Sequence, residues 1–283
     1  MDLKLLAESE DSGYQPIAGN RSRGLYCNDC RIVLQNSRPC SVDFIYIDPP
    51  YYTKRKFHGR GRQEATRPGA LHFDDRWKGG HVAYLEFLEQ RVRLMHGVLR
   101  PEGVLLVHLD WHIVHYVKVM LDQIFGIDRL INELIWHYQT GGASRRHFSR
   151  KHDTILVYGR GDTYYFNAAV VAAPRSPKAL HRARWSKGAR ISRQHTHKNP
   201  DDVITIPALN PMAGERTGFP TQKPLALLEL LISAFCPPEG VVADYFCGSG
   251  TTLTAARRLG RCYTGCDISA AAVRMVRTRL RET

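Results

Sequence analysis

The sequence predicts an α/β protein built on a mostly parallel sheet, and three observations support this fold class. Short apolar runs such as "VDFIYI", residues 42–47, alternate with longer segments whose apolar residues follow a helical spacing. Turn-forming residues separate the two kinds of segment, as in Pro101-Glu102-Gly103. A chain of 283 residues, 43% of them hydrophobic, is also long enough to bury a core on such a sheet, as one large domain or a domain with an insertion.

The first half of the chain predicts strands joined by crossover helices. A strand, a helix, a second strand and a second helix are expected in turn over residues 42–47, 84–99, 104–110 and 115–125. Two further strand-like runs, 132–138 and 152–159, are separated by a polar loop. We interpret them as an antiparallel hairpin that closes one edge of the sheet.

The second half begins with an interruption of this pattern. Between residues 163 and 200 there is no Asp or Glu, whereas basic residues recur, at Arg175, Lys178, Arg182, Arg184, Lys187, Arg190, Arg193 and Lys198. We interpret this segment as an insertion outside the sheet. The alternation then returns, and helix, strand, helix, strand and a basic terminal helix are expected over residues 223–235, 241–246, 251–260, 262–267 and the end of the chain.

The charge of the chain favours a polyanionic partner. Forty Lys and Arg residues against 27 Asp and Glu residues give a formal net charge of +13, for which nucleic acid is the first candidate. The start, "MDLKLLAESEDSGYQ", lacks the basic start and the long apolar core of a signal peptide, and no later run is long enough to span a bilayer. We therefore expect a cytoplasmic protein without a membrane partner.

The seven cysteines are an odd number without the spacing of a disulfide framework, which favours reduced thiols. Cys27 and Cys30 could combine with Cys262 and Cys266 in a four-thiolate zinc site, but the two pairs lie far apart in the chain. Small core residues are the favoured interpretation, and we predict no metal site.

A pair of glycines marks a candidate ligand site. Gly248 and Gly250 follow an expected strand and precede a helix, where missing side chains let a ligand approach backbone N–H groups. Leu253 occupies the third position of the motif G-x-G-x-x-G, which argues against a dinucleotide. Asp267, at the end of the next strand, could bind ribose hydroxyls. A tight turn and a helix-capping Asp explain the same residues equally well from this pattern alone.

The strand at 42–47 is followed by Asp48-Pro49-Pro50-Tyr51, a combination suited to an exocyclic base amine. The lone pair of such an amine is delocalised into the ring, so the nitrogen needs hydrogen-bond acceptors and not a strong base. Asp48 offers a carboxylate, Pro49 a backbone carbonyl at fixed φ, and Tyr51 a flat face for a flipped-out base. Positioning beside a methyl donor then permits transfer without a covalent intermediate. The alternative is a Pro-Pro turn that only ends the strand.

These two motifs together resemble those of the S-adenosylmethionine-dependent DNA amino-methyltransferases, which methylate adenine N6 or cytosine N4. That family combines a catalytic [DNS]-P-P-[YF] motif with a cofactor motif F-x-G-x-G, matched here by residues 48–51 and 246–250. The catalytic motif comes first, and residues 221–224, "TQKP", precede the glycine strand, an order similar to the β-class. The resemblance implies a Rossmann-like methyltransferase fold with circularly permuted motif order, and S-adenosylmethionine as cofactor.

The resemblance also assigns roles to single residues. The catalytic motif is Asp48, Pro49, Pro50 and Tyr51. The positions that match the cofactor site are Asp29, Thr221, Lys223, Asp244, Phe246, Gly248, Gly250 and Asp267. Within this set Asp29 matches the acid near the adenine, Asp267 matches the ribose acid, and Thr221 and Lys223 match the motif that closes over the methionine end. Tyr52 replaces the Asn that often follows the tetrapeptide.

The same comparison divides the chain into four segments. Residues 1–23 form an N-terminal extension, 24–162 the catalytic half of the methyltransferase domain, 163–220 a basic insertion expected to recognise the target, and 221–283 the cofactor-binding half. A Rossmann-like sheet can keep its strand neighbours while the termini move to another surface connection, so the two motifs are expected at the carboxyl ends of adjacent strands.

Basic residues near both motifs predict contacts with double-stranded DNA, at Arg55, Arg145, Arg146, Arg182, Arg184 and Arg190. For any single Arg, a solvated loop is the simpler explanation. Trp136, His137 and Tyr138 could line the base pocket or pack in the strand core. A cognate restriction endonuclease and a homodimer are left open as further partners.

Three functions compete at this point. A DNA amino-methyltransferase explains both motifs and the charge; an RNA or protein methyltransferase more often carries Asn at the position of Asp48; and a non-catalytic DNA-binding module leaves both motifs unexplained. Adenine N6 is preferred over cytosine N4, because an Asp-led tetrapeptide is commoner among the adenine enzymes. The bulky ring of Tyr52 opposes this preference, since beside the target pocket it would favour a pyrimidine.

Overall fold

An eight-stranded sheet forms the centre of the molecule. The computed structural model describes residues 24–53, 56–58, 72–138, 144–180, 196–210 and 212–283. The strand order is β1-β12-β11-β2-β5-β7-β6-β10. These strands are β1 (Gly24–Cys27), β2 (Val42–Ile47), β5 (Leu99–Leu109), β6 (Leu130–His137), β7 (His152–Gly159), β10 (Val203–Thr205), β11 (Val241–Asp244) and β12 (Cys262–Asp267). All neighbours pair in parallel except β7, which is antiparallel to β5 and β6. The mostly parallel sheet with an antiparallel hairpin is therefore confirmed.

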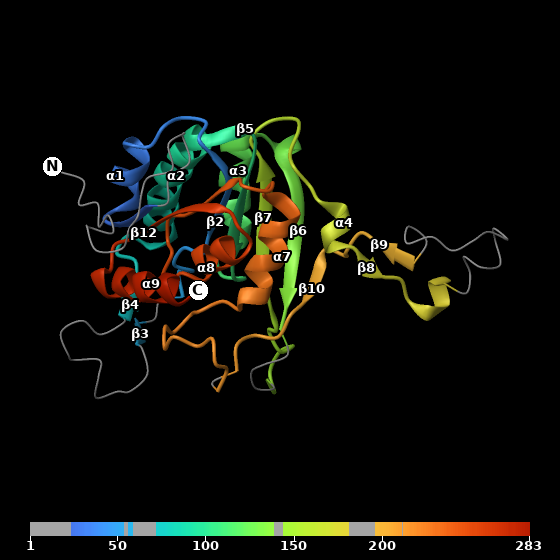
Figure 1. Cartoon of the computed structure of the whole chain (residues 1–283). Helices are drawn as coiled ribbons and strands as arrows, with labels where there is room; N and C mark the ends of the chain where they lie inside the picture. Colours follow the sequence, from blue (N-terminus) through green and yellow to red (C-terminus); the bar gives the residue numbers. More distant parts are fainter. Residues whose placement is uncertain (1–23, 54–55, 59–71, 139–143, 181–195, 211) are drawn as a thin grey trace.

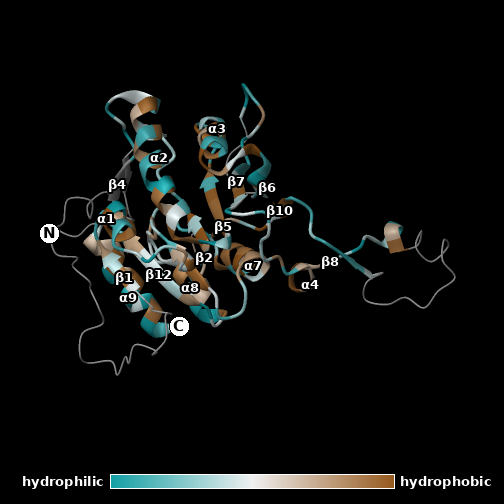
Figure 2. Ribbon diagram, turned by 90° about the horizontal axis from the view of Figure 1, so that it is seen from above, coloured by the Kyte–Doolittle hydropathy of each residue, from teal (hydrophilic) through white to brown (hydrophobic). Residues whose placement is uncertain are grey.

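Two layers of helices cover this sheet, one on each face (Figures 1 and 2). The first layer holds α1 (Cys30–Gln35), α2 (Gly80–Val98) and α3 (Val114–Phe125); the second holds α7 (Leu225–Phe235), α8 (Thr251–Arg258) and α9 (Ala270–Glu282). Because both faces are covered, β2 is apolar on both sides: Ile45 and Ile47 join the first core, and Phe44 and Tyr46 join the second. None of the helices in the described residues has the length and apolar character needed to cross a membrane.

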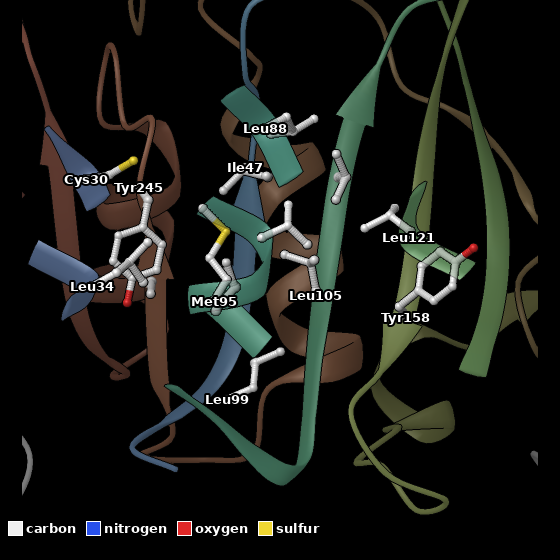
Figure 3. Packing of buried hydrophobic residues seen from close by; sticks show 14 of the residues in the cluster. Cys30, Leu34, Ile47, Leu88, Met95, Leu99, Leu105, Leu121, Tyr158 and Tyr245 are labelled. Carbon is white, nitrogen blue, oxygen red and sulfur yellow. The ribbon is translucent and has the colours of Figure 1, made fainter. Parts of the chain in front are cut away.

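The packing of α2 fixes the strand that leads into the catalytic motif. Figure 3 shows Leu88 and Met95 of α2 beside Ile47 of β2 and Leu105 of β5, and all four side chains are fully buried. Burial of one such side chain contributes about 1.5–3 kcal/mol relative to exposure. The thiols of the same core, among them Cys30, Cys262 and Cys266, are buried as well.

Two details of the sheet differ from the sequence expectation. Pro101-Glu102-Gly103 does not interrupt the chain between a helix and a strand: β5 begins at Leu99 and runs through these residues, with a register shift against β2. The β6–β7 hairpin does not close the sheet either, because β10 pairs in parallel with the outer side of β6. A three-residue strand carries too little periodicity to be found in the sequence.

The described residues between 163 and 200 contribute no strand to the main sheet, whereas β10, within the predicted insertion 163–220, does. Those between 163 and 200 hold the single-turn α4 (Ala168–Val171) and a separate two-stranded ribbon of β8 (Ala173–Pro174) and β9 (His197–Lys198). Figure 1 shows this ribbon to one side of the sheet, beyond β10. A second small antiparallel pair, β3 (Lys56–His58) and β4 (His72–Asp74), follows the catalytic motif.

The order of the strands brings the two motifs together. From β11 the chain passes through α8 to β12, toward the β1 edge of the sheet. From β2 it passes through α2 to β5, toward the β10 edge, so the direction of the connections reverses between β11 and β2. Open α/β sheets bind ligands at the carboxyl ends of the strands where this direction reverses. Asp48 directly follows β2 and Asp244 ends β11, so both lie at this point.

Candidate active site

A cavity of about 490 Å³ opens at the carboxyl ends of β2, β11 and β12. This volume falls within the usual range of sites for small ligands and cofactors. Of the residues predicted for catalysis and cofactor binding, the cavity is lined by Asp29, Asp48, Pro49, Pro50, Tyr51, Thr221, Lys223, Asp244, Phe246, Gly248 and Asp267. The structure thus brings both motifs into one site, whereas Gly250 lies outside this lining.

The two glycines act differently. Both have positive φ, +47° at Gly248 and +74° at Gly250, which disfavours other residues. A Cβ atom on Gly248 would lie 3.1 Å from the ring of Phe219, another residue of the cavity wall. A Cβ atom on Gly250 would lie 2.7 Å from Val276 of α9. Gly248 therefore keeps the cavity open, and Gly250 permits the close packing of α8 against α9.

Two carboxylates flank the glycine loop, the buried Asp244 and the half-buried Asp267. Asp267 accepts hydrogen bonds from the N–H groups of Gly248, at 2.9 Å, and Ser269, at 2.8 Å. Asp244 accepts one from the N–H of Phe246 at 3.0 Å. Burial raises the pKa of both acids, to about 7 for Asp244. A cation in the cavity would favour their ionised forms, which fits S-adenosylmethionine, since this cofactor carries a sulfonium and an ammonium group.

Asp29 is held by a residue that the sequence analysis did not single out. Its carboxylate accepts two hydrogen bonds from Nη2 of Arg91, at 2.9 and 3.0 Å, and it also caps α1. The guanidinium of Arg91 lies 3.5 Å from the centre of the Phe87 ring, and both residues line the cavity. Nε of Arg91 is buried and has no hydrogen-bond partner within the described residues. Aromatic and polar side chains therefore meet at this end of the cavity, a lining that fits a nucleoside.

The carboxylate of Asp48 is engaged on both oxygens. Oδ1 of Asp48 accepts a hydrogen bond from the Tyr51 hydroxyl, and Oδ2 lies 2.5 Å from Nζ of Lys223. Lys223 also lies 5.2 Å from the centre of the Tyr51 ring. The resemblance placed Lys223 at the methionine end of the cofactor, whereas the structure places its ammonium beside the carboxylate of Asp48. A carboxylate offers about four lone-pair sites, so Asp48 retains capacity for a target amine.

A second buried acid, Asp75, shapes the turn after the tetrapeptide. Its carboxylate accepts hydrogen bonds from the N–H of Tyr52 at 2.9 Å and from the N–H and hydroxyl of Thr53, both at 2.6 Å. Tyr52 has a φ of 60°, in the left-handed region that Asn tolerates better than Tyr. This conformation gives a physical reason for an Asn at this position in the resembling family. The Tyr52 ring packs against Tyr84, and Tyr52 does not line the cavity.

A buried hydrogen-bond network lies beneath the catalytic motif. His108 of β5 is fully buried, with Nδ1 2.7 Å from the Tyr46 hydroxyl and Nε2 3.1 Å from Oδ2 of Asp153. Burial alone would raise the pKa of Asp153, but the hydrogen bond and charge of His108, followed by the charge of Lys223, bring it below its ordinary value. Because the ionised acid only accepts, Nε2 of His108 carries a proton. The His108 ring stacks near-parallel to Tyr51, at 18° and 6.1 Å between centres.

The remaining candidates fall into two groups. Trp136 is buried and donates to the carbonyl of Ile206 at 2.8 Å, so it belongs to the core. The Tyr138 hydroxyl donates to Asp153 at 3.2 Å, so it belongs to the hydrogen-bond network around His108. Arg145 and Arg146 are exposed on the loop between β6 and β7. The other predicted DNA contacts, Arg55, Arg182, Arg184 and Arg190, lie outside the described residues.

Known proteins share this sequence pattern and fold. The family model N6_N4_Mtase, described as DNA methylase, matches residues 42–278. Type II methyltransferase M.HpaI of Haemophilus parainfluenzae is 28% identical, over 90% of this chain and 73% of that protein. DNA adenine methyltransferase YhdJ of Escherichia coli (strain K12) is 26% identical, over 93% and 84%. The solved structure of the PvuII DNA methyltransferase (cytosine-N4-specific) has a TM-score of 0.64 at 14% identity, over 92% of this chain and 86% of that one.

The family model spans β2, the tetrapeptide after it and the glycine loop, and therefore most of the chain. The structural likeness supports the Rossmann-like methyltransferase fold independently of sequence identity. The chain belongs to this family of DNA methylases, the S-adenosylmethionine-dependent enzymes that methylate exocyclic base amines in DNA.

Proposed function

We propose that Asp48 and the backbone carbonyl of Pro49 receive the amine of a flipped-out base, and that Tyr51 stacks on that base. One observation carries this assignment: the tetrapeptide and the glycine loop line the same cavity, from adjacent strands β2 and β11. Acceptors on the amine hydrogens turn the nitrogen lone pair toward the methyl donor. No covalent bond to the protein is required.

S-adenosylmethionine supplies an electrophilic methyl group when bound. The base nitrogen gains that methyl group and then releases one proton. We assign to Asp48 the role of first acceptor of this proton. Lys223 holds the carboxylate in place through Oδ2, the oxygen of Asp48 that Tyr51 does not contact. Asp75 fixes the turn at Tyr52 and so sets the direction in which Tyr51 leaves the strand.

For the cofactor, we assign the end of the cavity at Asp29, Arg91 and Phe87 to the adenine, and Asp267 to the ribose hydroxyls. Asp244, whose pKa burial raises to about 7, lies in the same wall and responds to a nearby cation. Gly248, Phe246 and Thr221 complete the wall around the methionine part. These assignments rest on the lining of the cavity together with the positions matched in the family.

For the target base, we propose adenine N6. The Tyr52 ring was the argument for a narrower pocket, but this ring packs against Tyr84 and stays out of the cavity wall. The remaining argument is the Asp at the first position of the tetrapeptide, Asp48, which is commoner among the adenine enzymes of the family and therefore favours adenine. YhdJ is named an adenine enzyme and the PvuII enzyme a cytosine-N4 enzyme, so the relatives do not decide between the bases.

Mass spectrometry of nucleosides tests the proposal. Unmethylated DNA is incubated with the chain and labelled S-adenosylmethionine, digested and resolved. We expect N6-methyladenine. N4-methylcytosine in its place would overturn the base preference and leave the roles of Asp48 and Tyr51 standing, whereas no methylated nucleoside would contradict the function itself.

Contacts with the rest of the duplex are proposed for the basic loops. Arg145 and Arg146 are exposed and lie between β6 and β7, whose hairpin extends from the sheet. The segment 163–220 remains the proposed target-recognition region. A paired restriction endonuclease and a homodimer stay predictions.

A further inference from the structure

The loop between β6 and β7 presents an aromatic ring to solvent. Phe148 is 98% exposed, more than any other large apolar side chain in the described part of the chain. An exposed ring gives up the stabilisation that burial provides, and because single exposed apolar side chains are common, its surroundings must show what it contacts.

The turn that carries Phe148 is held by its own hydrogen bonds. The Ser144 hydroxyl oxygen accepts from the N–H groups of Arg146, at 3.2 Å, and His147, at 3.3 Å. The Ser149 hydroxyl oxygen accepts from the N–H of Ser144 at 3.2 Å. Phe148 is therefore displayed at a defined place on the hairpin.

A stack of side chains ties this loop to the edge of the sheet that holds the active site. The guanidinium of Arg150 lies 3.7 Å from the centre of the Trp111 ring, which stacks on His112 at 3.8 Å. His112 is held by Asp110, through its N–H at 2.9 Å and its ring Nδ1 at 2.6 Å. Trp111 comes two residues after β5, the neighbour of the strand that leads to Asp48.

The direction of the strands agrees with this placement. β6 runs parallel to β2 in the sheet, so its carboxyl end and the hairpin loop lie at the same edge as Asp48. Figure 1 shows the β6–β7 hairpin extending past the sheet at its lower edge, the edge near β3 and β4.

The charge around the ring selects one kind of partner. Residues 144–151, "SRRHFSRK", contain no acid, and Arg145, Arg146 and Arg150 are exposed beside Phe148. Cations contact phosphates, and an apolar ring among them fits between stacked bases. Duplex DNA offers both features.

We propose that Phe148 enters the base stack of duplex DNA beside the target base as that base leaves for the cavity, an inference that rests on the proposed function. A ring in this place restores stacking that is lost when the base is extruded, and so stabilises the opened duplex. Arg145 and Arg146 contact phosphates next to it. The ring also stacks beside the partner base that extrusion leaves unpaired, so its benefit is largest where the target base must leave a base pair.

Two synthetic duplexes test this role, after the methylated position has been mapped by sequencing DNA treated with the full chain. In one duplex the target base is paired; in the other it lies opposite an abasic position, where extrusion costs less. Phe148→Ala should slow single-turnover methylation of the paired duplex by about ten- to hundredfold, the range of one lost stacking contact. The abasic duplex should be slowed much less, and Phe148→Trp should retain most activity on both.

Two control variants separate this effect from others. Ile127→Ala removes an exposed apolar side chain before β6, at the opposite edge of the sheet, and should change neither rate. Arg145→Gln removes a cation from the same turn and should slow both duplexes alike, because both carry phosphates.

Equal slowing of both duplexes by Phe148→Ala, or no slowing of either, overturns the proposed role of the ring. Wild-type rates combined with a changed oligomeric state in sedimentation would assign Phe148 to a protein contact and overturn it as well. If the wild-type chain methylates no DNA, the proposed function itself is contradicted. If the wild-type chain is active and Phe148→Ala behaves as just described, only the proposed role of Phe148 is contradicted.

Discussion

The ammonium of Lys223 lies 2.5 Å from Oδ2 of Asp48, across 175 residues of sequence. The contact joins the segment before α7 to the residue after β2, and so links the glycine-loop half of the chain to the catalytic motif. The side chains are only 10% and 18% exposed. Removing one partner of such a shielded pair leaves the other charge uncompensated, which is strongly unfavourable.

Lys223→Met should lower kcat for DNA methylation by about tenfold or more, the effect of losing one hydrogen bond to a charged group. Asp48 would lose the cation that fixes one of its oxygens. Steady-state kinetics with labelled cofactor measures this. Lys118→Met is the matched control, because Lys118 pairs with Asp122 at 2.7 Å on α3, outside the cavity. A kcat near the wild-type value for Lys223→Met would remove this residue from the catalytic step.

Asp267→Ala should weaken S-adenosylmethionine binding by about 1.5–3 kcal/mol, the contribution of a charge-assisted hydrogen bond. The carboxylate is oriented by the N–H groups of Gly248 and Ser269, and faces the cavity. Isothermal titration calorimetry gives the Kd. Asp201→Ala, at an exposed ion pair with Lys198, should leave the Kd unchanged. An unaltered Kd for Asp267→Ala would exclude the acid from the cofactor site.

Asp244 should make the stability of the cofactor-free protein depend on pH. Burial raises its pKa to about 7 in the folded state, against about 3.9 in the unfolded chain. Between these values the folded state holds a proton that the unfolded state has lost, so the contribution of Asp244 to stability falls as the pH rises from about 4 to about 7 and then stays level.

Asp244→Asn is neutral throughout this range and should lack the dependence. The free energy of unfolding of the variant should therefore rise, relative to wild type, by up to about 4 kcal/mol between about pH 4 and about pH 8. Urea unfolding at several pH values measures the difference. A difference that is constant with pH would show that Asp244 titrates alike in both states.

His108→Phe should destabilise the fold by about 1–3 kcal/mol for each buried partner left unpaired. The substitution keeps a ring next to Tyr51 but removes the bonds to Tyr46 and Asp153. Urea unfolding measures the loss, and kcat should fall with it if the network positions Tyr51. His115→Phe, on the exposed side of α3, should leave both unchanged. Wild-type stability in His108→Phe would contradict the network.

Local pattern accounts for the parts of this fold that the sequence predicted. β2 and β11 are buried on both faces, so they appear as continuous apolar runs, and the polar residues Asp48 and Asp244 mark their carboxyl ends. Short elements without a period, such as β1 and β10, gave no such signal. The strand β5 was predicted from residue 104, and its start at Leu99 was missed because Pro101 and Gly103 indicate a break, whereas the sheet absorbs them in a register shift.

The site was predicted where a motif is contiguous and missed where tertiary contacts build it. Arg91 had a signal, since it shares the buried side of α2 with Leu88 and Met95 at helical spacing. Asp75 had none, because it acts on Tyr52 and Thr53 through a fold that no local pattern reports. The contact of Lys223 with Asp48 likewise depends on which strands become neighbours.

Asp48→Ala tests the catalytic assignment most directly. Two quantities are measured on the same preparation: S-adenosylmethionine affinity by calorimetry, and methylated nucleosides from treated DNA by mass spectrometry. We expect cofactor affinity close to wild type and no methylated base, because the proposed function gives Asp48 to the target amine and gives the cofactor to other residues that line the cavity. Near-wild-type formation of methylated base by Asp48→Ala would contradict the proposed role of this carboxylate.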